Sequence, residues 1–309
     1  MHPFTRNPAK SVSSLGEERL IVLIRRWLGS VSPKAPFGIG DDCAVLPARS
    51  GPRLITVDPV IYRRHFDDSV PPRDVGAKLL KRNLSDLAAM GGRPNTAVLA
   101  LTLDRRVNIA WLEQFYRGLA ACARRYDVSV VGGDVAQADG ILAASLTLLG
   151  EPTGPRIVTR AGAQRGDWIY VTGQLGRSRS SRHHYRFTPR LPEGAWLARQ
   201  ANVRAMMDVS DGLAKDLRAL TPRQSQAALI PGAIPRRSGA SIANALGDGE
   251  DYELVFALSR SADHTLFERR WHRAFPRTRL SCIGHFSPVG KLPAGTVDLR
   301  RFHGYEHLT

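Results

Sequence analysis

The stretch NLSDLAAMGGRP, at residues 83–94, best indicates the fold of this chain. Leu80, Leu84 and Leu87 recur at the spacing of one face of a helix, so the pattern predicts a helix over residues 74–90. Gly91-Gly92 should end it, because glycine followed closely by proline is a helix stop signal. Residues 96–103 then alternate loosely between apolar and polar, which predicts a strand directly after the helix.

Asp86 has an unusual position on this predicted helix. It shares a face with Leu79 and Asn83, at the edge of the apolar face. A carboxylate at such an edge should be paired or metal-bound, because an unpaired buried charge is costly. Lys81 and Arg82 could pair with it, but they point elsewhere on the helix. We therefore expect Asp86 to bind a metal ion.

Outward from this stretch, strands and helices alternate in two rounds. The first round has helices over 15–28 and 108–126 and strands over 54–60, 128–131 and 141–149. The stretch EPTGP at residues 151–155 has a linker composition. The second round has strands over 167–172, 205–209, 252–258 and 280–283 and helices over 194–201, 212–220 and 261–274. We expect a mixed α/β (α+β) fold in two domains, residues 1–150 and 151–309.

Composition limits the class of protein. The chain has 309 residues, of which 43% are hydrophobic and 23% charged, as in a soluble globular protein. Its longest apolar runs are far shorter than a membrane span, and the N-terminus lacks the apolar core of a secretory signal. Cys43, Cys122 and Cys282 lie far apart, which indicates neither a zinc site nor a disulfide framework. We expect a cytoplasmic protein without membrane contact.

The formal net charge of +16 comes mostly from arginine, and residues 177–190 contain five arginines and two histidines. A basic patch can bind nucleic acid or polyphosphate. The alternative is a solvated, arginine-rich surface that needs no partner. The sequence has no helix-turn-helix, aromatic RNA-binding motif or zinc finger, so we favour the solvated surface and do not expect nucleic acid as a partner.

Against this positive charge, aspartates gather in four short phrases with glycine or small neighbours. These phrases are GIGDD (38–42), VGGD (131–134), DVSDG (208–212) and GDGED (247–251). Mg²⁺ takes oxygen ligands, usually one or two carboxylates together with phosphate oxygens, and glycine lets the backbone approach a phosphate closely. The phrases together indicate metal-assisted phosphate chemistry.

The phrase DVSDG follows a predicted strand and opens a predicted helix. Asp208 and Asp211 flank Ser210 and can converge on one ion, while the helix N-terminus offers N–H donors to an anion. One of the two aspartates could instead cap the helix. Because a cap needs only one aspartate, we favour the functional interpretation.

Other phrases are ambiguous alone. Gly132-Gly133-Asp134 reads as a tight turn that presents one carboxylate and free N–H groups, but such a turn is also ordinary. Taken alone, Gly40-Asp41-Asp42 could likewise be an ordinary turn or part of a binding site, and His65 could be an ordinary surface histidine. The sequence has no P-loop GxxxxGK[ST] motif, so bound metals would supply most of the positive charge if the chain handles ATP.

In their order along the chain, these phrases resemble the thiamine-monophosphate kinases of the aminoimidazole ribonucleotide synthetase-like superfamily. The resemblance covers nearly the whole chain. It rests on GIGDDCAVL (38–46), ITVD with HF (55–58, 65–66), NLSDLAAMGGRP (83–94), VVGGD (130–134), RAGAQRGDWIYVTGQLG (160–176), MDVSDGL (207–213), GEDYEL (249–254) and GYEHL (304–308). NLSDLAAMG with GEDYEL separates the kinase from related enzymes.

The resemblance implies ATP- and Mg²⁺-dependent conversion of thiamine monophosphate to thiamine diphosphate, with an N-terminal domain that binds ATP and Mg²⁺ and dimerises with its twin. It implies a C-terminal α/β domain that closes the site and no obligatory catalytic group beyond the metal ligands. The positions that match metal ligands are Asp42, Thr56, Asp58, Asp86, Asp134, Asp208 and Asp211. Those that match nucleotide contacts are Tyr116, Gly133, Asp134, Arg160 and Ser210, and those that match acceptor contacts are His65, Glu250 and Tyr305.

The chain departs from the family pattern at several positions. Val57 replaces a threonine, Tyr62-Arg63-Arg64 replaces a Glu-Gly type of pair, Val135-Ala136 replaces two threonines, and Arg177 replaces an aspartate. A helical segment after Arg177 is largely replaced by the arginine-histidine run. Two alternatives therefore stay open, a related ATP-dependent enzyme with another acceptor and a non-catalytic descendant that binds nucleotide or nucleic acid.

Overall fold

A computed structural model describes residues 1–309 except 35–36, 40–43, 47–49 and 307–309. The chain forms two compact units. The N-terminal unit comprises Met1–Leu84 and Pro94–Glu151, and the C-terminal unit comprises Ser85–Arg93 and Pro152–Thr309. The last turn of the helix that carries Asp86 thus belongs with the C-terminal unit.

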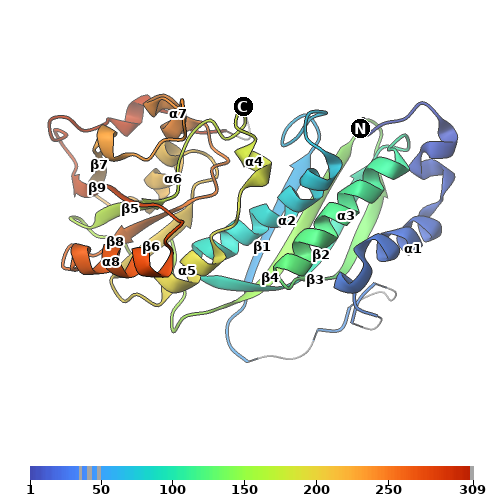
Figure 1. Cartoon of the computed structure of the whole chain (residues 1–309), viewed down its shortest axis with the longest axis horizontal. Helices are drawn as coiled ribbons and strands as arrows, with labels where there is room; N and C mark the ends of the chain where they lie inside the picture. Colours follow the sequence, from blue (N-terminus) through green and yellow to red (C-terminus); the bar gives the residue numbers. More distant parts are fainter. Residues whose placement is uncertain (35–36, 40–43, 47–49, 307–309) are drawn as a thin grey trace. The chain divides into compact units, whose positions relative to one another are not determined.

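The N-terminal unit is built on a four-stranded sheet with the order β1-β4-β2-β3 (Figure 1). Its strands are β1 (Leu54–Ile61), β2 (Gly92–Leu103), β3 (Ser129–Gln137) and β4 (Leu142–Pro152). β1 pairs antiparallel with β4, and β2 pairs parallel with β3. The unit therefore has a mixed sheet, as expected from its alternation of strands and helices.

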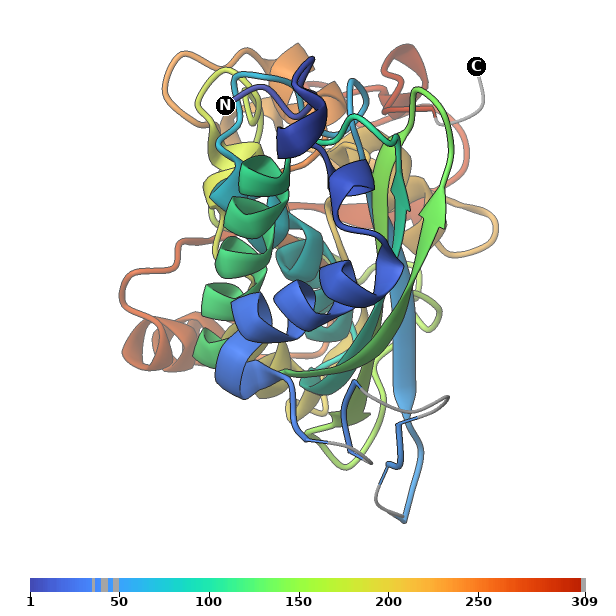
Figure 2. The ribbon, with the colours of Figure 1, turned by 90° about the vertical axis from the view of Figure 1, so that its right-hand side faces the viewer.

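Three helices complete this unit, namely α1 (Glu17–Leu28), α2 (Pro72–Ala89) and α3 (Ile109–Arg125). Figure 2 shows α1 and α3 on the same side of the sheet. α2 and α3 cross closely, because a Cβ at Gly76 would clash with the carbonyl oxygen of Phe115 and one at Gly118 with that of Arg73. Trp111 stacks between Phe66 and Phe115, with ring centroids 5.8 Å apart on each side. Glycine contacts and stacked rings therefore hold the helices against their neighbours.

The C-terminal unit is built on a five-stranded sheet with the order β6-β8-β5-β9-β7, in which all four pairs of neighbouring strands are antiparallel. Its strands are β5 (Trp168–Thr172), β6 (Val203–Asp208), β7 (Ser225–Leu229), β8 (Leu254–Leu258) and β9 (Leu280–Pro288). Its helices are α4 (His183–Arg186), α5 (Leu191–Ala198), α6 (Leu213–Leu220), α7 (Ile242–Gly247) and α8 (His264–Ala274). Apolar clusters pack on both faces, so every residue of β8 is buried.

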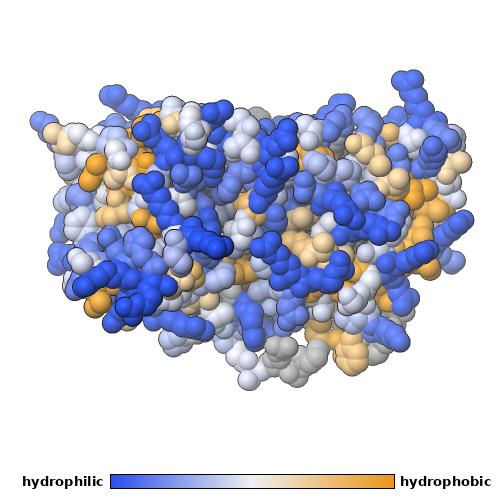
Figure 3. Space-filling view, viewed as in Figure 1, coloured by the Kyte–Doolittle hydropathy of each residue, from blue (hydrophilic) through white to orange (hydrophobic). Residues whose placement is uncertain are grey.

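The expected mixed α/β fold with two sheets is confirmed. The helix predicted over 108–126 is α3, with Asn108 as its N-cap and Tyr126 as its C-cap. The predicted division of function between residues 1–150 and 151–309 stays a prediction. Among the described residues, no helix combines the length and the apolarity that a membrane span requires. Figure 3 shows a face on which hydrophilic side chains predominate, in line with the 44 lysines and arginines.

Several predicted elements were wrong. Gly132-Gly133-Asp134 is no turn but part of β3, because these residues pair with Val98–Ala100 of β2 in a parallel ladder. The helix expected over 194–201 is α5, which begins at Leu191 with proline in its first turn. β7, α7 and the short α4 were not predicted, because each spans too few residues for a helix or strand period to be recognised in its apolar pattern.

Candidate functional site

Asp208, a predicted metal ligand, is the last residue of β6 and lies in the C-terminal unit. Its side chain is buried, and the Ser85 hydroxyl donates a hydrogen bond of 2.7 Å to Asp208 Oδ2. Ser85 belongs to the NLSDLAAMGGRP stretch, and it lies on α2 directly before Asp86, which is partly exposed. The link between α2 and β6 therefore connects the NLSDLAAMGGRP stretch to the DVSDG phrase.

Asp211, three residues further, lies beside the C-terminal Tyr305. Lys215 Nζ contacts Asp211 Oδ2 at 2.9 Å and donates to the Tyr305 carbonyl at 2.6 Å. The Tyr305 amide donates to the Asp211 carbonyl at 2.8 Å. The structure thus brings together one predicted metal ligand and one predicted acceptor contact that are 94 residues apart in the sequence.

The backbone amides directly before α6 have an acceptor within the protein, while anion binding by the N–H groups of α6 itself stays a prediction. The amides of Ser210 and Asp211 both donate to Asp216 Oδ2, each at 3.0 Å. Burial, with the negative charge of Asp211 nearby, raises the pKa of Asp216 to about 7. The helix therefore supplies its own acceptor, because Asp216 lies in its first turn.

Glu250 adjoins the same turn. Its amide donates to the Ser210 carbonyl at 2.7 Å, and its backbone is left-handed with φ 54°. Arg179 Nε lies 3.5 Å from Glu250 Oε2, and the Tyr252 hydroxyl donates to Oε1 at 3.5 Å. Hydrogen bonds thus join Glu250 to Ser210 and Tyr305 to Asp211, and Asp208 lies two residues before Ser210 in the same region of the C-terminal unit.

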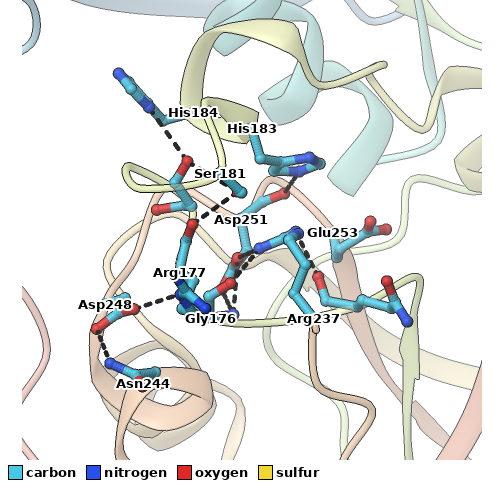
Figure 4. A network of polar contacts seen from close by, with 12 residues as sticks. Gly176, Arg177, Ser181, His183, His184, Arg237, Asn244, Asp248, Asp251 and Glu253 are labelled. Atoms are coloured by element: carbon cyan, nitrogen blue, oxygen red, sulfur yellow. Dashed lines mark hydrogen bonds and ion pairs between the residues drawn. The ribbon is translucent and has the colours of Figure 1, made fainter. Parts of the chain in front are cut away.

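The arginine-rich segment (residues 177–190) packs along the acidic motif (residues 249–254), as Figure 4 shows in part. The Ser178 hydroxyl donates to the Gly249 carbonyl at 2.6 Å, and His183 Nε2 donates to the Asp251 carbonyl at 2.9 Å. Arg190 makes two hydrogen bonds of 2.7 Å to Glu253. Four of the five arginines of the segment are exposed, as a solvated surface predicts, namely Arg177, Arg179, Arg182 and Arg186, whereas Arg190 binds an acid of the acidic motif.

Asp251 is the most deeply buried acid of the acidic motif. It is fully buried, and it accepts hydrogen bonds from the Gly176 amide at 3.0 Å and from Arg237 at 2.8 Å (Figure 4). Burial raises the pKa of Asp251 to about 7, although Arg237 and the Gly176 amide act in the opposite direction. These contacts fix the backbone next to Glu250.

The N-terminal unit contains a pocket of about 500 Å³ that is lined by three predicted nucleotide contacts, Tyr116, Gly133 and Asp134. α1 supplies an apolar wall, including Ile21 and Ile24. Tyr116 is 2% exposed, and burial raises the pKa of its hydroxyl, so it stays neutral. The pocket combines an apolar wall with the glycine-rich edge strand, an arrangement that suits a flat heteroaromatic ring with a phosphate group.

Two other predicted site residues of the N-terminal unit, Asp58 and His65, have hydrogen-bond partners within the protein. Arg82 donates to Asp58 Oδ1 at 2.9 Å and to the Pro59 carbonyl at 2.8 Å. His65 Nδ1 accepts from the Ile61 amide at 3.1 Å, so the ring proton of the neutral form lies on Nε2. Thr56 lies two residues before Asp58 on β1, and both point to one face of the strand.

Two predicted residues remain. Arg160 is exposed. The carbonyl of the preceding residue, Thr159, accepts a hydrogen bond from the amide of Met206. Met206 lies on β6, two residues before Asp208. Asp42 lies outside the described residues.

The donor chemistry of the C-terminal site fits Mg²⁺. Carboxylate oxygens are the ligands Mg²⁺ prefers, and Asp211 already holds one cation, the Lys215 ammonium. Within the described part of the chain, no three His, Cys, Asp or Glu side chains form a ready-made metal cluster.

Several important residues were missed by sequence reasoning. Ser85, Lys215 and Asp216 contact predicted site residues directly, and Arg190 and Arg237 hold buried acids of the acidic motif. Asp211 lies directly before α6 and Lys215 in its first turn, and this separation of four residues is a signal that could have identified the ion pair. Arg237 and Asp251 are 14 residues apart, so their spacing along the chain does not indicate an ion pair.

Comparison with known proteins first gives a class. Residues 40–151 match the family described as AIR synthase related protein, N-terminal domain. This class agrees with the mixed α/β units described above.

The particular family follows from full-length relatives. The thiamine-monophosphate kinase of Escherichia coli (strain K12) is 35% identical over 281 residues, covering 81% of this chain and 84% of that protein. The crystal structure of a thiamine-monophosphate kinase from Stenotrophomonas maltophilia K279a is 31% identical with a TM-score of 0.73, covering 90% of this chain and 96% of that one. A structure of AaThiL complexed with AMPPCP and TMP is 28% identical with a TM-score of 0.72, covering 96% and 98%. The chain belongs to the thiamine-monophosphate kinase family and is therefore classed among enzymes, which confirms the predicted resemblance.

Proposed function

We propose that this protein transfers the γ-phosphoryl group of ATP to thiamine monophosphate and forms thiamine diphosphate. The observation that carries the proposal is the grouping of Asp208, Ser210, Asp211, Glu250 and Tyr305 at the end of β6, where Glu250 is hydrogen-bonded to Ser210 and Tyr305 to Asp211. A family relative, AaThiL, has been solved in complex with AMPPCP and TMP, which supports the same pair of substrates.

The nucleotide is assigned to Tyr116, Gly133, Asp134, Arg160 and Ser210. The 500 Å³ pocket of the N-terminal unit supports this assignment, because three of these residues line it. The acceptor is assigned to His65, Glu250 and Tyr305. Glu250 offers a carboxylate, which suits the cationic and amino-bearing part of thiamine.

Mg²⁺ is assigned to Asp42, Thr56, Asp58, Asp86, Asp134, Asp208 and Asp211. When bound, Mg²⁺ neutralises the charge that develops on the transferring phosphoryl group. In this chain, Ser85 orients the Asp208 carboxylate, and Lys215 and Arg82 hold Asp211 and Asp58 in fixed positions.

The chemistry requires little of the protein beyond alignment. A phosphate oxygen of the acceptor is already ionised at neutral pH, so it attacks in line without an obligatory general base. The residues bind both substrates, exclude water and orient the acceptor oxygen toward the γ-phosphorus. A homodimer, a cytoplasmic location and an N-terminal domain specialised for ATP and Mg²⁺ are part of the same proposal.

The test is a coupled assay for thiamine diphosphate with purified protein, Mg-ATP and thiamine monophosphate. We expect turnover that depends on both substrates and on added Mg²⁺. Preserved nucleotide binding without any thiamine diphosphate would contradict the proposal.

A second candidate is a related ATP-dependent enzyme that uses another acceptor. It is favoured by a second pocket of about 610 Å³ in the N-terminal unit, lined by Phe4, Arg6, Tyr62, Arg63 and Arg106 among others. Arg63 has a left-handed backbone with φ 65°, at a position where the family pattern has glycine. A screen of phosphorylated heteroaromatic acceptors with Mg-ATP separates the two candidates.

A further inference from the structure

Helix α1 presents a straight stripe of side chains to the pocket of the N-terminal unit. The stripe consists of Glu17, Ile21, Ile24 and Leu28, all of which line the pocket. Residues at intervals of four, three and four lie on one face of a helix, so the Glu17 carboxylate continues the line of the three apolar side chains. An acid therefore lies at the N-terminal end of an otherwise apolar wall.

Packing fixes the position of this wall. Leu28 is fully buried, and the ring of Trp27 lies beside that of Tyr116 with centroids 5.9 Å apart. Gly16 is the N-cap residue of α1 and has φ 70°, a conformation that glycine adopts without strain. The helix is thus held in place, and Glu17 is presented from its first turn.

The Glu17 side chain is accessible to a ligand. It is exposed, and within the part of the chain that the structure describes its carboxylate makes no hydrogen bond or ion pair with the protein. Two other polar side chains belong to the described lining of the pocket, namely the buried Tyr116 and Asp134, which is assigned to Mg²⁺. Glu17 is therefore a carboxylate of the pocket to which the proposed function gives no role.

Charge decides which part of a nucleotide faces Glu17. A carboxylate repels the triphosphate, which we place beside Gly133 and the Mg²⁺ ligand Asp134. The uncharged base suits the apolar stripe, because a flat ring can bury one face against Ile21 and Ile24. The edge of the ring then lies toward the acid at the end of the stripe.

Adenine carries a donor that matches this acceptor. Its exocyclic amino group donates hydrogen bonds, whereas guanine and hypoxanthine carry a keto oxygen at the same ring position. A carboxylate only accepts hydrogen bonds, so it attracts the amino group and repels the oxygen. We propose that Glu17 is a specificity-determining residue that accepts a hydrogen bond from the adenine amino group and selects ATP over nucleotides with a keto oxygen. This inference rests on the proposed function, which assigns the nucleotide to this pocket.

Nucleotide titrations of Glu17→Ala, Glu17→Gln and the matched control Glu18→Gln test the inference. The measured quantity is the ratio of Kd for inosine triphosphate to Kd for ATP, with Mg²⁺ present and the acceptor absent, so that no turnover is needed. Glu18 belongs to the same first turn and is also exposed, but it is not among the described residues that line the pocket. Removing its charge therefore has the same effect on the helix N-terminus as removing that of Glu17.

The wild type should bind ATP at least about tenfold more tightly than inosine triphosphate, because the keto oxygen leaves the carboxylate without a donor. Glu17→Ala should bring the ratio close to one by weakening ATP binding. Glu17→Gln should lower the ratio mainly by tightening inosine triphosphate, since its amide can donate to the keto oxygen. Glu18→Gln should keep the wild-type ratio. Melting curves check folding, and Glu17→Gln decides the test if the alanine variant is not folded.

The outcomes separate this inference from the proposed function. An unchanged ratio in both Glu17 variants overturns the role of Glu17, and so does a wild type that binds the two nucleotides equally. A preference for ATP over deoxy-ATP that is lost in Glu17→Ala, with the base ratio unchanged, also overturns it, because the acid would then contact the sugar. The expected ratios together with no thiamine diphosphate in the coupled assay contradict the proposed function alone. A wild type that binds neither nucleotide overturns both.

Discussion

The two candidate regions of this protein use opposite physical means. The 500 Å³ pocket of the N-terminal unit has an apolar wall from α1, a buried neutral tyrosine and a glycine-rich strand. The region at the end of β6 in the C-terminal unit is crowded with charge, and its carboxylates are held by Ser85, Lys215, Arg179 and two backbone amides. We expect ligand binding in the pocket to depend on its shape and binding in the C-terminal region to depend on charge. Substitutions that change volume should therefore affect the first region most, and substitutions that remove charge should affect the second.

Arg190→Ala should have the largest effect, because it removes the partner of a buried acid in the charged unit. Glu253 is 2% exposed and accepts two hydrogen bonds of 2.7 Å from Arg190. Leaving this charge buried without arginine should lower the free energy of unfolding by about 3–5 kcal/mol. Urea denaturation measures the loss.

The control for that variant is Arg300→Ala, which breaks an exposed pair with Asp298 in the same unit. It should leave the urea midpoint unchanged. Equal losses in the two variants would contradict the claim that buried charge dominates the C-terminal unit.

Asp208→Asn should lower kcat/KM by about 10²–10³-fold, because removing one metal-binding carboxylate costs several kcal/mol of transition-state stabilisation. Asparagine still accepts the Ser85 hydrogen bond, so the melting temperature should change little. The coupled assay measures the rate, and Asp298→Asn is the matched control because its carboxylate pairs with Arg300 and Arg301 and is not one of the proposed ligands. Wild-type activity in Asp208→Asn would refute its assignment.

Gly133→Ala tests the region governed by shape. A Cβ at Gly133 would clash with the carbonyl oxygen of Leu99 across the β2–β3 ladder, whereas one at Gly132 would lie 3.5 Å from Val98 Cγ1. Gly133→Ala should therefore lower the free energy of unfolding by about 1–3 kcal/mol and weaken ATP binding. Gly132→Ala should be tolerated in both thermal melts and ATP titrations. If both variants behave alike, close backbone approach is not what the glycine provides.

Asp216→Asn should have a smaller effect that depends on pH. The folded-state pKa of Asp216 is about 7, above its ordinary value of 3.8, so the stability it contributes is present below about pH 4 and is lost as the pH rises through 7. Asparagine avoids this loss. The variant's free energy of unfolding relative to wild type should increase by about 1–2 kcal/mol between pH 5 and pH 8. Parallel pH curves for the two proteins would contradict the raised pKa.

The sequence predicted the long elements better than the short ones. α3 and the helix over NLSDLAAM have several turns, so their periodicity is clear. β7 and α7 span only a few residues, and their apolar patterns cannot be told from loops. The prediction of a turn at Gly132-Gly133-Asp134 was wrong because glycine occurs both in turns and in strands that approach another backbone closely.

The site was predictable to a similar degree. Asp208, Asp211 and Glu250 stood out because acids with small neighbours are uncommon in so basic a chain. Their partners Ser85 and Arg179 did not stand out, since both are common residue types that lie far from those acids in the sequence, whereas Lys215 follows Asp211 by only four residues. Arg190 looked like one of several surface arginines, although it binds a buried glutamate.

The sequence by itself determined the family, the succession of helices and strands and the identity of most acids in the site. These properties depend on residue types and local spacing, which a linear pattern records. Only the tertiary structure decided which polar and charged groups meet. It brings Ser85 to Asp208, Arg82 to Asp58 and the arginine-rich segment to the acidic motif. Such pairings join residues that lie far apart in the chain, and they form because folding buries carboxylates that need a donor or a cation.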